Sequence, residues 1–446
     1  MQTHVHHHHQ TRVIRPVLAR LLCAVMTAGV VFGPAPAAAQ EIVPAPPQRT
    51  PIALVGGTIH TVANGVVENG TIVFADGRIT AVGANVQVPA NAERVDISGK
   101  HVYPGLIAAF STVGITEIGS VAVTNDTSEL GDVNPNVRAE VAVNAESRHI
   151  GTTRSNGVLV TLTSPSGGLI SGLAAAMNLD GWTWEEMTLK AAAALIVNWP
   201  NPGSDDYADD LAELGGIFDT ARAYRARKEQ GNAATLHSDP RWEAMRPVFN
   251  GDLPVIVDAD DVAQMQDAMA WAKAEKLRII LRGGRDAWYI AEHLARAQVP
   301  VLLTSVISGP GRDWEPIDAA YGQPRRLHEA GVRFAIAGGS SAAYANRLPY
   351  EAGAAIAYGL PPDEALKAVT LYPAQILGID DRVGSLQPGR DATLLITTGH
   401  PLEYSTIVEQ AYIEGREIDM MDAHKRFFEK YRKKQQQQQR RGGGGR

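Results

Sequence analysis

The chain has 446 residues, of which 45% are apolar and 20% are charged. This composition is ordinary for a globular protein, and the length is enough for a large core and more than one domain. The formal net charge is −7; residues 1–39 contribute +3 and residues 425–446 contribute +8, so residues 40–424 carry −18. A body this acidic argues against nucleic-acid binding, which needs a basic surface.

Residues 1–39 have the order of a secretory signal peptide. Three arginines between positions 12 and 20 form a positive region, residues 21–32 are apolar, and the alanines at 37–39 make a small-residue cleavage site. The apolar run is too short for a membrane span, and no other stretch is long and apolar enough to be one. We expect cleavage near Ala39 and a periplasmic or secreted mature protein; an uncleaved anchor is the weaker alternative.

The single cysteine, Cys23, lies within this leader. The mature chain would therefore have neither disulfides nor thiolate metal ligands, and packing alone must hold it together.

Short strands are predicted near both ends of the mature chain. Near the first end, β-branched and apolar residues mark strands at 52–54, 58–61 and 71–75. Asp76-Gly77 is a hairpin signal, because glycine tolerates the positive φ of a type I′ turn. Near the other end, a strand is expected at 393–397, and residues 411–413 can pair with 416–418.

Between these ends, strand-like and helix-like runs alternate. Strands are expected at 253–257, 278–281, 299–304 and 333–337, and helices at 262–274, at 288–297 and within 317–331. Alternation of this kind predicts a parallel sheet with covering helices.

Residues 421–446 form a basic tail of low complexity. Met421, Phe427, Phe428 and Tyr431 could form one or two amphipathic turns. From Gln435 onward the chain has nothing to bury, so disorder is expected there.

Two motifs resemble the amidohydrolase superfamily, and in particular its imidazolonepropionase-like group. Residues 104–112 have the frame of that superfamily's first barrel strand, Pro-Gly-apolar-apolar-Asp-x-His-x-His. Residues 386–392, Leu-Gln-Pro-Gly-Arg-Asp-Ala, resemble the turn that marks its small β-sandwich. The resemblance implies an α/β fold, a (β/α)₈ TIM-like barrel with a small β-sandwich built from both chain ends.

The resemblance also implies a domain division. It places the signal peptide at 1–39, the composite β-sandwich domain at 40–103 and 381–420, the amidohydrolase-like barrel at 104–380 and the tail at 421–446.

The first barrel strand lacks the residues that bind metal in active relatives. Phe110 and Thr112 stand at the two histidine positions, and Ala108 stands at the aspartate. Phenylalanine has no lone pair to give a metal. The resemblance therefore implies a metallohydrolase scaffold that has lost its metal site, and we expect no metal and no other cofactor.

Later strands differ from the active pattern in the same way. Where relatives read Val-His-Ala-His, this chain has Asp258 and Asp260 at the histidine positions. Arg282 stands where a histidine often closes the next strand, and arginine is permanently cationic. Gly339 stands where an aspartate holds the metal-bound water. The eight histidines that remain after cleavage show no ligand spacing.

The replacement residues are expected to meet at the barrel mouth. Alternate residues of a strand share a side, so Asp258 and Asp260 should point alike, with Arg282 bonded to at least one of them. Three interpretations stay open. The residues could form a structural ion pair, or, with Arg285, a site for a small ligand bearing amine and carboxylate groups. Alternatively, the two aspartates and Glu117 could bind Ca²⁺ or Mg²⁺.

Two functions remain from this reasoning. The first is a non-catalytic binding or partner subunit, which would hold a small-molecule ligand or pair with an active amidohydrolase relative. The alternative is a metal-independent hydrolase of cyclic amides, acyl amino acids or dipeptides. It would use Asp258 or Asp260 as general base and Arg282 as electrostatic stabiliser. The family resemblance implies hydrolysis of non-peptide carbon–nitrogen bonds.

Overall fold

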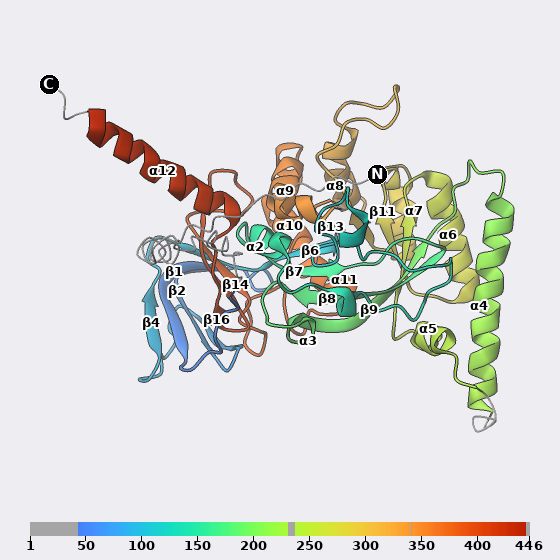
Figure 1. Ribbon diagram of the computed structural model, residues 1–446, viewed down its shortest axis with the longest axis horizontal. Coiled ribbons are helices and arrows are strands. Elements are labelled where there is room, and N and C mark those ends of the chain that lie inside the picture. The colour runs from blue at the N-terminus through green and yellow to red at the C-terminus, as the bar shows by residue number, and fades with distance from the viewer. Residues whose placement is uncertain (1–42, 231–236, 340, 443–446) are drawn as a thin grey trace, which may run out of the picture. The chain divides into compact units, whose positions relative to one another are not determined.

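A computed structural model describes residues 43–230, 237–339 and 341–442 (Figure 1). The expected signal peptide and Cys23 lie outside these ranges, so both expectations about them stay predictions. No helix in the described part of the chain is both long and apolar enough to cross a membrane.

Strands from both ends of the chain form the first sheet. Its order is β16-β15-β14-β5-β1-β2-β3, and β4 pairs with β1. The bounds are β1 (Ile52–His60), β2 (Val66–Ala75), β3 (Arg78–Gly83), β4 (Glu93–Asp96), β5 (His101–Pro104), β14 (Leu394–Thr397), β15 (Val408–Ile413) and β16 (Arg416–Glu417). The early and late strands join where β5 pairs antiparallel with β14.

The predicted hairpin turn between β2 and β3 is present. Asp76 and Gly77 have φ values of 50° and 79°, the left-handed conformation that a type I′ turn requires at both central residues. Large buried side chains then close one face of the sheet, and the rings of Phe74 and Tyr412 meet edge to face at 5.1 Å.

The second sheet has eight strands in chain order and nearly closes into a barrel, because its end strands, β6 and β13, lie in contact. The bounds are β6 (Leu106–Ser111), β7 (Val158–Thr163), β8 (Ile170–Asn178), β9 (Thr188–Asn198), β10 (Val255–Ala259), β11 (Ile279–Gly283), β12 (Val301–Leu303) and β13 (Phe334–Ile336). The expected fold class, a TIM-like barrel with a separate sheet, is confirmed.

One part of the barrel departs from a regular (β/α)₈ pattern. Strand β8 runs antiparallel to both β7 and β9, whereas the other neighbouring strands are parallel. Only a short loop joins β7 to β8, and Gly167 and Gly168 have φ values of 89° and 64° there. Between β8 and β9 lies only the one-turn helix α3 (Trp184–Met187). A parallel crossover needs a dozen or more residues, so these short connections impose the reversed strand.

Helices follow most of the other barrel strands. They are α2 (Arg148–Arg154), α4 (Tyr207–Glu229), α5 (Pro240–Asn250), α6 (Val262–Glu275), α7 (Ala291–Ala297), α8 (Ala319–Glu329), α9 (Leu348–Ala357), α10 (Pro362–Ala368) and α11 (Leu371–Leu377). Short 3₁₀ segments lie at Ala122–Thr124, Ala139–Ala142, Ala287–Ile290 and Ala342–Arg347. The helix expected at 288–297 is thus divided into a 3₁₀ turn and α7.

The barrel lumen is a packed apolar core. Alternate residues of the strands fill it, including Ile107, Ile196, Ile256, Ile280 and Leu302, all of which are at most 2% exposed. In a barrel packed this way, a ligand can be reached only at the strand ends. The same alternation places the next inward positions of β10 and β11, Asp258 and Arg282, above this core.

The basic tail forms a helix, α12 (Ala423–Gly442), so the disorder expected from Gln435 onward is wrong for residues 435–442. Lysine, arginine, glutamine and glutamate are good helix formers, and no glycine or proline interrupts them before Gly442.

Candidate functional site

Asp258 and Arg282 form an ion pair at the top of the barrel lumen. They are direct partners in the parallel register of β10 and β11. Arg282 Nε and Nη2 donate to the two oxygens of Asp258 at 3.2 and 2.9 Å. The arginine side chain is 3% exposed, whereas that of Asp258 is 44% exposed. The bidentate geometry is the strongest form of such a pair.

Two further contacts hold the Arg282 guanidinium in place. Its Nη1 donates to Ser164 Oγ at 3.2 Å, and its carbon lies 4.2 Å from the centroid of the Phe110 ring. A cation over an aromatic face is attracted by the negative charge density of that face. Phe110 and Arg282, at two positions where the sequence resemblance implied histidines in active relatives, therefore stack on each other.

Thr112 and Gly339, which follow the ends of β6 and β13, contribute no metal ligand set in the described part of the chain. Thr112 Oγ1 accepts a hydrogen bond from the backbone N–H of Ala342 at 3.1 Å. Gly339 has a φ of 94°, in the left-handed region that favours glycine over aspartate. An aspartate at position 339 would therefore strain the backbone.

Asp260 takes no part in the bidentate pair, in which Arg282 is bonded to Asp258, one of the two expected aspartates. Strand β10 ends at Ala259, and the chain then turns into α6, so the alternation of sides no longer applies. The backbone N–H of Asp260 donates to Gln264 Oε1 at 2.9 Å, and the N–H of Arg285 donates to Asp260 Oδ1 at 3.3 Å. Gly283 has a φ of 94°, and a Cβ there would lie 2.6 Å from the same oxygen, so the position favours glycine.

A cavity of about 310 Å³ opens beside Asp260. It is lined by the end of β11, the segment after β12 and one side of α8, with Asp260, Arg285, Trp288, Thr304, Ser308 and Gln323 among its residues.

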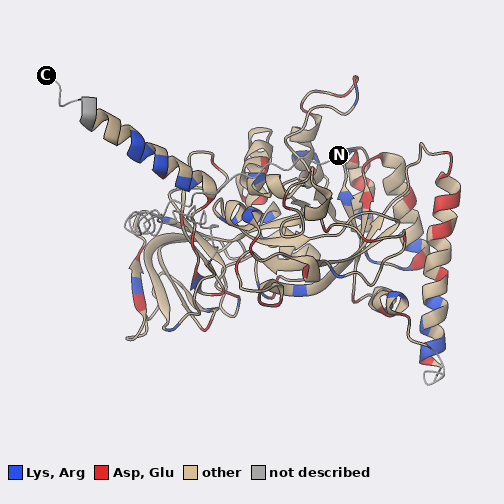
Figure 2. Ribbon diagram, in the orientation of Figure 1, with Lys and Arg blue, Asp and Glu red and all other residues tan. Residues whose placement is uncertain are grey.

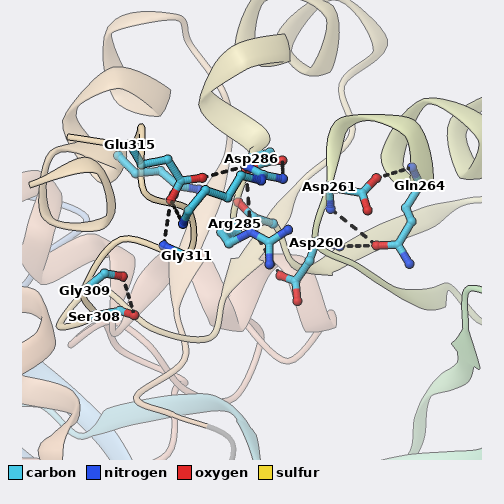
Figure 3. A network of polar contacts seen from close by, with 12 residues as sticks. Asp260, Asp261, Gln264, Arg285, Asp286, Ser308, Gly309, Gly311 and Glu315 are labelled. Atoms are coloured by element: carbon cyan, nitrogen blue, oxygen red, sulfur yellow. Dashed lines mark hydrogen bonds and ion pairs between the residues drawn. The ribbon is translucent and has the colours of Figure 1, made fainter. Parts of the chain in front are cut away.

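A polar network fixes the loop that walls this cavity (Figure 3). Asp286 accepts two hydrogen bonds from Arg312, at 2.9 and 2.7 Å. Arg312 also donates to Glu315 at 2.6 Å, and Glu315 accepts from the N–H of Gly311 at 2.7 Å. Arg312 thus bonds both Asp286 and Glu315, and these two carboxylates raise its pKa.

Three charged residues line the cavity, Asp260, Arg285 and Glu315, and Glu315 is bonded to Arg312. Burial raises the pKa of Asp260 above its ordinary value, and the backbone N–H of Arg285 and its nearby guanidinium oppose this increase. The Arg285 side chain is 45% exposed, and its Nε lies 3.6 Å from Asp286 Oδ1. Apart from the paired Glu315, the cavity offers one acid and one partly exposed cation, which suits a small polar ligand that carries both charges.

The residues proposed from the sequence for a hard-cation site do not gather. Within residues 43–230, 237–339 and 341–442, no three His, Cys, Asp or Glu side chains lie close enough together to hold a metal ion. Glu117 instead accepts a hydrogen bond from Asn144 Nδ2 at 3.3 Å. The set of Asp258, Asp260 and Glu117 is therefore not formed.

Sequence spacing missed two features. His60 and His101 are far apart in the sequence, yet their ring nitrogens lie 3.1 Å apart because β1 pairs with β5. The cavity wall was missed as well, although Ser308-Gly309-Pro310-Gly311 marks a turn. Nothing in the sequence spacing connects that turn to Asp260.

The chain is similar to known hydrolases in sequence. The amidohydrolase family model matches residues 263–419. An amidohydrolase from Hapsidospora irregularis, tasK, is 22% identical over 78% of this chain, and the chain spans only 39% of that protein. Imidazolonepropionases are 25% identical in Symbiobacterium thermophilum and 23% in Acidiphilium cryptum. These matches cover 75% and 80% of this chain, and 85% and 94% of those proteins.

Solved structures show the same fold. An amidohydrolase from Thermotoga maritima matches with a TM-score of 0.75 at 24% identity, over 82% of this chain and 99% of that one. Molinate hydrolase matches with a TM-score of 0.54 at 16% identity, over 84% and 95%.

Proposed function

Because the chain belongs to the amidohydrolase superfamily, we propose that it is a member in which ligand binding has replaced metal-dependent hydrolysis. It would act as a non-catalytic subunit that binds a small molecule carrying both an amine and a carboxylate. The observation that carries this proposal is the buried guanidinium of Arg282, which stacks on Phe110 and bonds the half-exposed Asp258 at the mouth of the barrel.

The residues at the mouth do not fit a catalytic divalent metal. Such a metal needs about three nitrogen or oxygen ligands and an open position for water. Here the Phe110 ring supplies no lone pair, and the guanidinium of Arg282 would repel a cation placed beside it. Asp258 already gives both of its oxygens to that guanidinium. We therefore derive no catalytic step through a metal.

The cavity beside Asp260 supports the ligand class. The Asp260 carboxylate can accept from an ammonium group, and the exposed guanidinium of Arg285 can bind a carboxylate in two parallel hydrogen bonds. Asp286 and Glu315 are both hydrogen-bonded to Arg312, which weakens their attraction for the ammonium group of a ligand. Trp288 adds an apolar surface to the same cavity.

The alternative is a metal-independent hydrolase, and for this function Arg282 does not serve as the expected electrostatic stabiliser. Arg282 is 3% exposed, is bonded to Asp258 and Ser164 and is not among the residues that line the cavity, so it cannot stabilise charge on a substrate there. One observation favours this alternative: the raised pKa of Asp260, since a general base works best with a pKa near the working pH. Asp260 would then be the base and Arg285 the stabiliser.

Turnover and binding together distinguish the two functions. The mature protein would be assayed against cyclic amides, acyl amino acids and dipeptides, with Asp260→Asn as the matched variant. We expect no turnover above that variant. We also expect zwitterionic amino-acid compounds to raise the melting temperature, and Asp260→Asn and Arg285→Gln to abolish that increase. Turnover that disappears in Asp260→Asn would instead establish the hydrolase.

Elemental analysis after gel filtration tests the premise about the metal. We expect no stoichiometric zinc, manganese or iron. About one such ion per chain, together with turnover that a chelator removes, would overturn the proposal in favour of conventional metal-dependent hydrolysis.

Location and partnership complete the proposal. The leader supports export to the periplasm or the medium. An active amidohydrolase relative is a reasonable partner subunit, because homologous chains share the surfaces from which oligomers are built. Co-purification of the tagged chain from its native host, followed by mass spectrometry, tests this partnership.

A further inference from the structure

The first turn of α12 is fixed to the body of the protein. Asp422, which is 6% exposed, accepts hydrogen bonds from Ser155 Oγ and from the N–H of Lys425. Lys425 Nζ in turn donates to the carbonyl oxygens of Ser155 and Met420, at 3.2 and 2.9 Å. Ser155 directly follows α2, so the start of α12 is anchored on a folded element.

Three aromatic side chains beyond this anchor are exposed. Phe427, Phe428 and Tyr431 are 56%, 66% and 55% exposed. At 3.6 residues per turn, their positions span about 100° of the helix surface, so they form one face. Three large rings in water on one face of a helix are a sign of an interaction surface.

Lysine and arginine side chains lie along the same helix, as the blue bands on α12 in Figure 2 show. Its charged side chains through Gln439, apart from the anchored Lys425, are Arg426, Glu429, Lys430, Arg432, Lys433 and Lys434. Glu429 pairs with Arg432 at 2.6 Å. The other four cations lie outside the aromatic face and flank it on the side of Phe427.

We propose that α12 docks the protein on an anionic phospholipid surface. The aromatic rings would enter the boundary between headgroups and acyl chains, and the long lysine and arginine side chains would reach the phosphates at the same level. An acidic protein partner would satisfy the cations but leave the three rings without a matching environment. A phospholipid interface accommodates both features.

The charge of the remaining chain restricts how docking occurs. Residues 40–424 carry a net charge of −18, which an anionic surface repels. Contact is therefore confined to α12, and the anchor at Asp422 connects the body to it. This inference goes beyond the proposed function and does not depend on the barrel mouth.

Vesicle co-sedimentation of the full mature chain tests this inference. Vesicles of phosphatidylcholine with and without phosphatidylglycerol would be compared at about 0.1 M and 0.5 M salt. We expect roughly tenfold stronger binding to the anionic vesicles at the lower salt, with most of that binding lost at the higher salt.

Two sets of substitutions separate the aromatic and cationic contributions. Phe427→Ala, Phe428→Ala and Tyr431→Ala together should weaken binding about fivefold or more, and so should Lys430→Gln, Lys433→Gln and Lys434→Gln. The matched control is Arg225→Gln with Arg227→Gln on α4, which should bind as the parent does. Circular dichroism would verify that the variants stay folded.

Three outcomes would overturn the inference. The first is equal binding to neutral and anionic vesicles, and the second is binding that neither set of α12 substitutions weakens. The third is salt-sensitive self-association without lipid that the aromatic substitutions leave intact, because it would identify the acidic body of a second copy as the partner of α12.

Discussion

At the scale of single residues, the barrel mouth is defined by what Arg282 contacts. Its guanidinium bonds Asp258 and Ser164 and covers the ring of Phe110, so a permanent cation occupies the centre of the strand ends. Arginine suits this position because its planar fork binds a carboxylate at its edge and stacks on an aromatic ring with its face. A lysine could provide the charge but not both contacts.

Arg282→Ala should destabilise the fold by about 2–3 kcal/mol, through loss of the stacking and of a hydrogen-bonded charge pair. The loss should fall below that of a fully buried pair, because Asp258 is 44% exposed and can be solvated in the variant. Arg282→Lys should recover less than half of the loss. Urea unfolding of the three proteins measures both, and an unchanged midpoint in Arg282→Ala would show that the pair contributes nothing.

His60 provides a pH-dependent contribution to stability. Burial, with a smaller contribution from the charges of His101 and His400, lowers its pKa from 6.5 to about 4. The unfolded chain therefore binds a proton before the folded one does, and stability should fall as the pH drops from about 6.5 to 4. Allowing for partial exposure, the loss should be about 2 kcal/mol. His60→Gln should reduce this slope in unfolding measured at several pH values, while His237→Gln serves as a control.

At the scale of elements, capping residues fix where a helix begins, and contacts between distant parts of the chain fix how strands pair. Helix α6 begins with a capping box, in which Asp261 accepts from the N–H of Gln264 and Gln264 accepts from the N–H of Asp261. The same glutamine also holds the N–H of Asp260. The start of one helix therefore positions an acid of the cavity.

Asp261→Ala should cost about 1 kcal/mol of stability, because a helix N-terminus loses its cap. It should also weaken ligand binding in the cavity, since Gln264 would no longer be held beside Asp260. Asp239→Ala, which removes the cap of the more distant α5, is the matched control. Thermal melts with and without ligand measure the two effects, and equal ligand shifts in both variants would contradict the coupling.

At the scale of the whole molecule, a barrel and a second sheet are joined by strands from both ends of the chain. Late strand β14 pairs with β5, which directly precedes the first barrel strand. Removing either end of the mature chain would therefore disturb the sheet that continues into the barrel. The leader precedes all of these elements.

We expect the exported protein to begin at Gln40, which can cyclise to pyroglutamate. Mass spectrometry of protein recovered from the cell envelope or the medium measures this directly. Detection of an intact Met1 in the exported protein would show that the leader is not cleaved.

The sequence by itself predicted whatever depends on short-range order. The β2–β3 turn followed from a glycine position, and helix α6 and the last four barrel strands, β10 to β13, followed from apolar periodicity. The pairing of Asp258 with Arg282 followed too, because alternate residues of neighbouring strands face the same side.

Only the tertiary structure decided where that periodicity stops. Asp260 leaves the lumen because β10 ends at Ala259, and β8 is reversed because its connections are too short for a crossover. The stacking of Arg282 on Phe110 and the cavity wall built around Arg312 join segments far apart in the chain. Such contacts depend on the closure of the whole barrel. The spacing of residues within one segment of the sequence therefore cannot predict them.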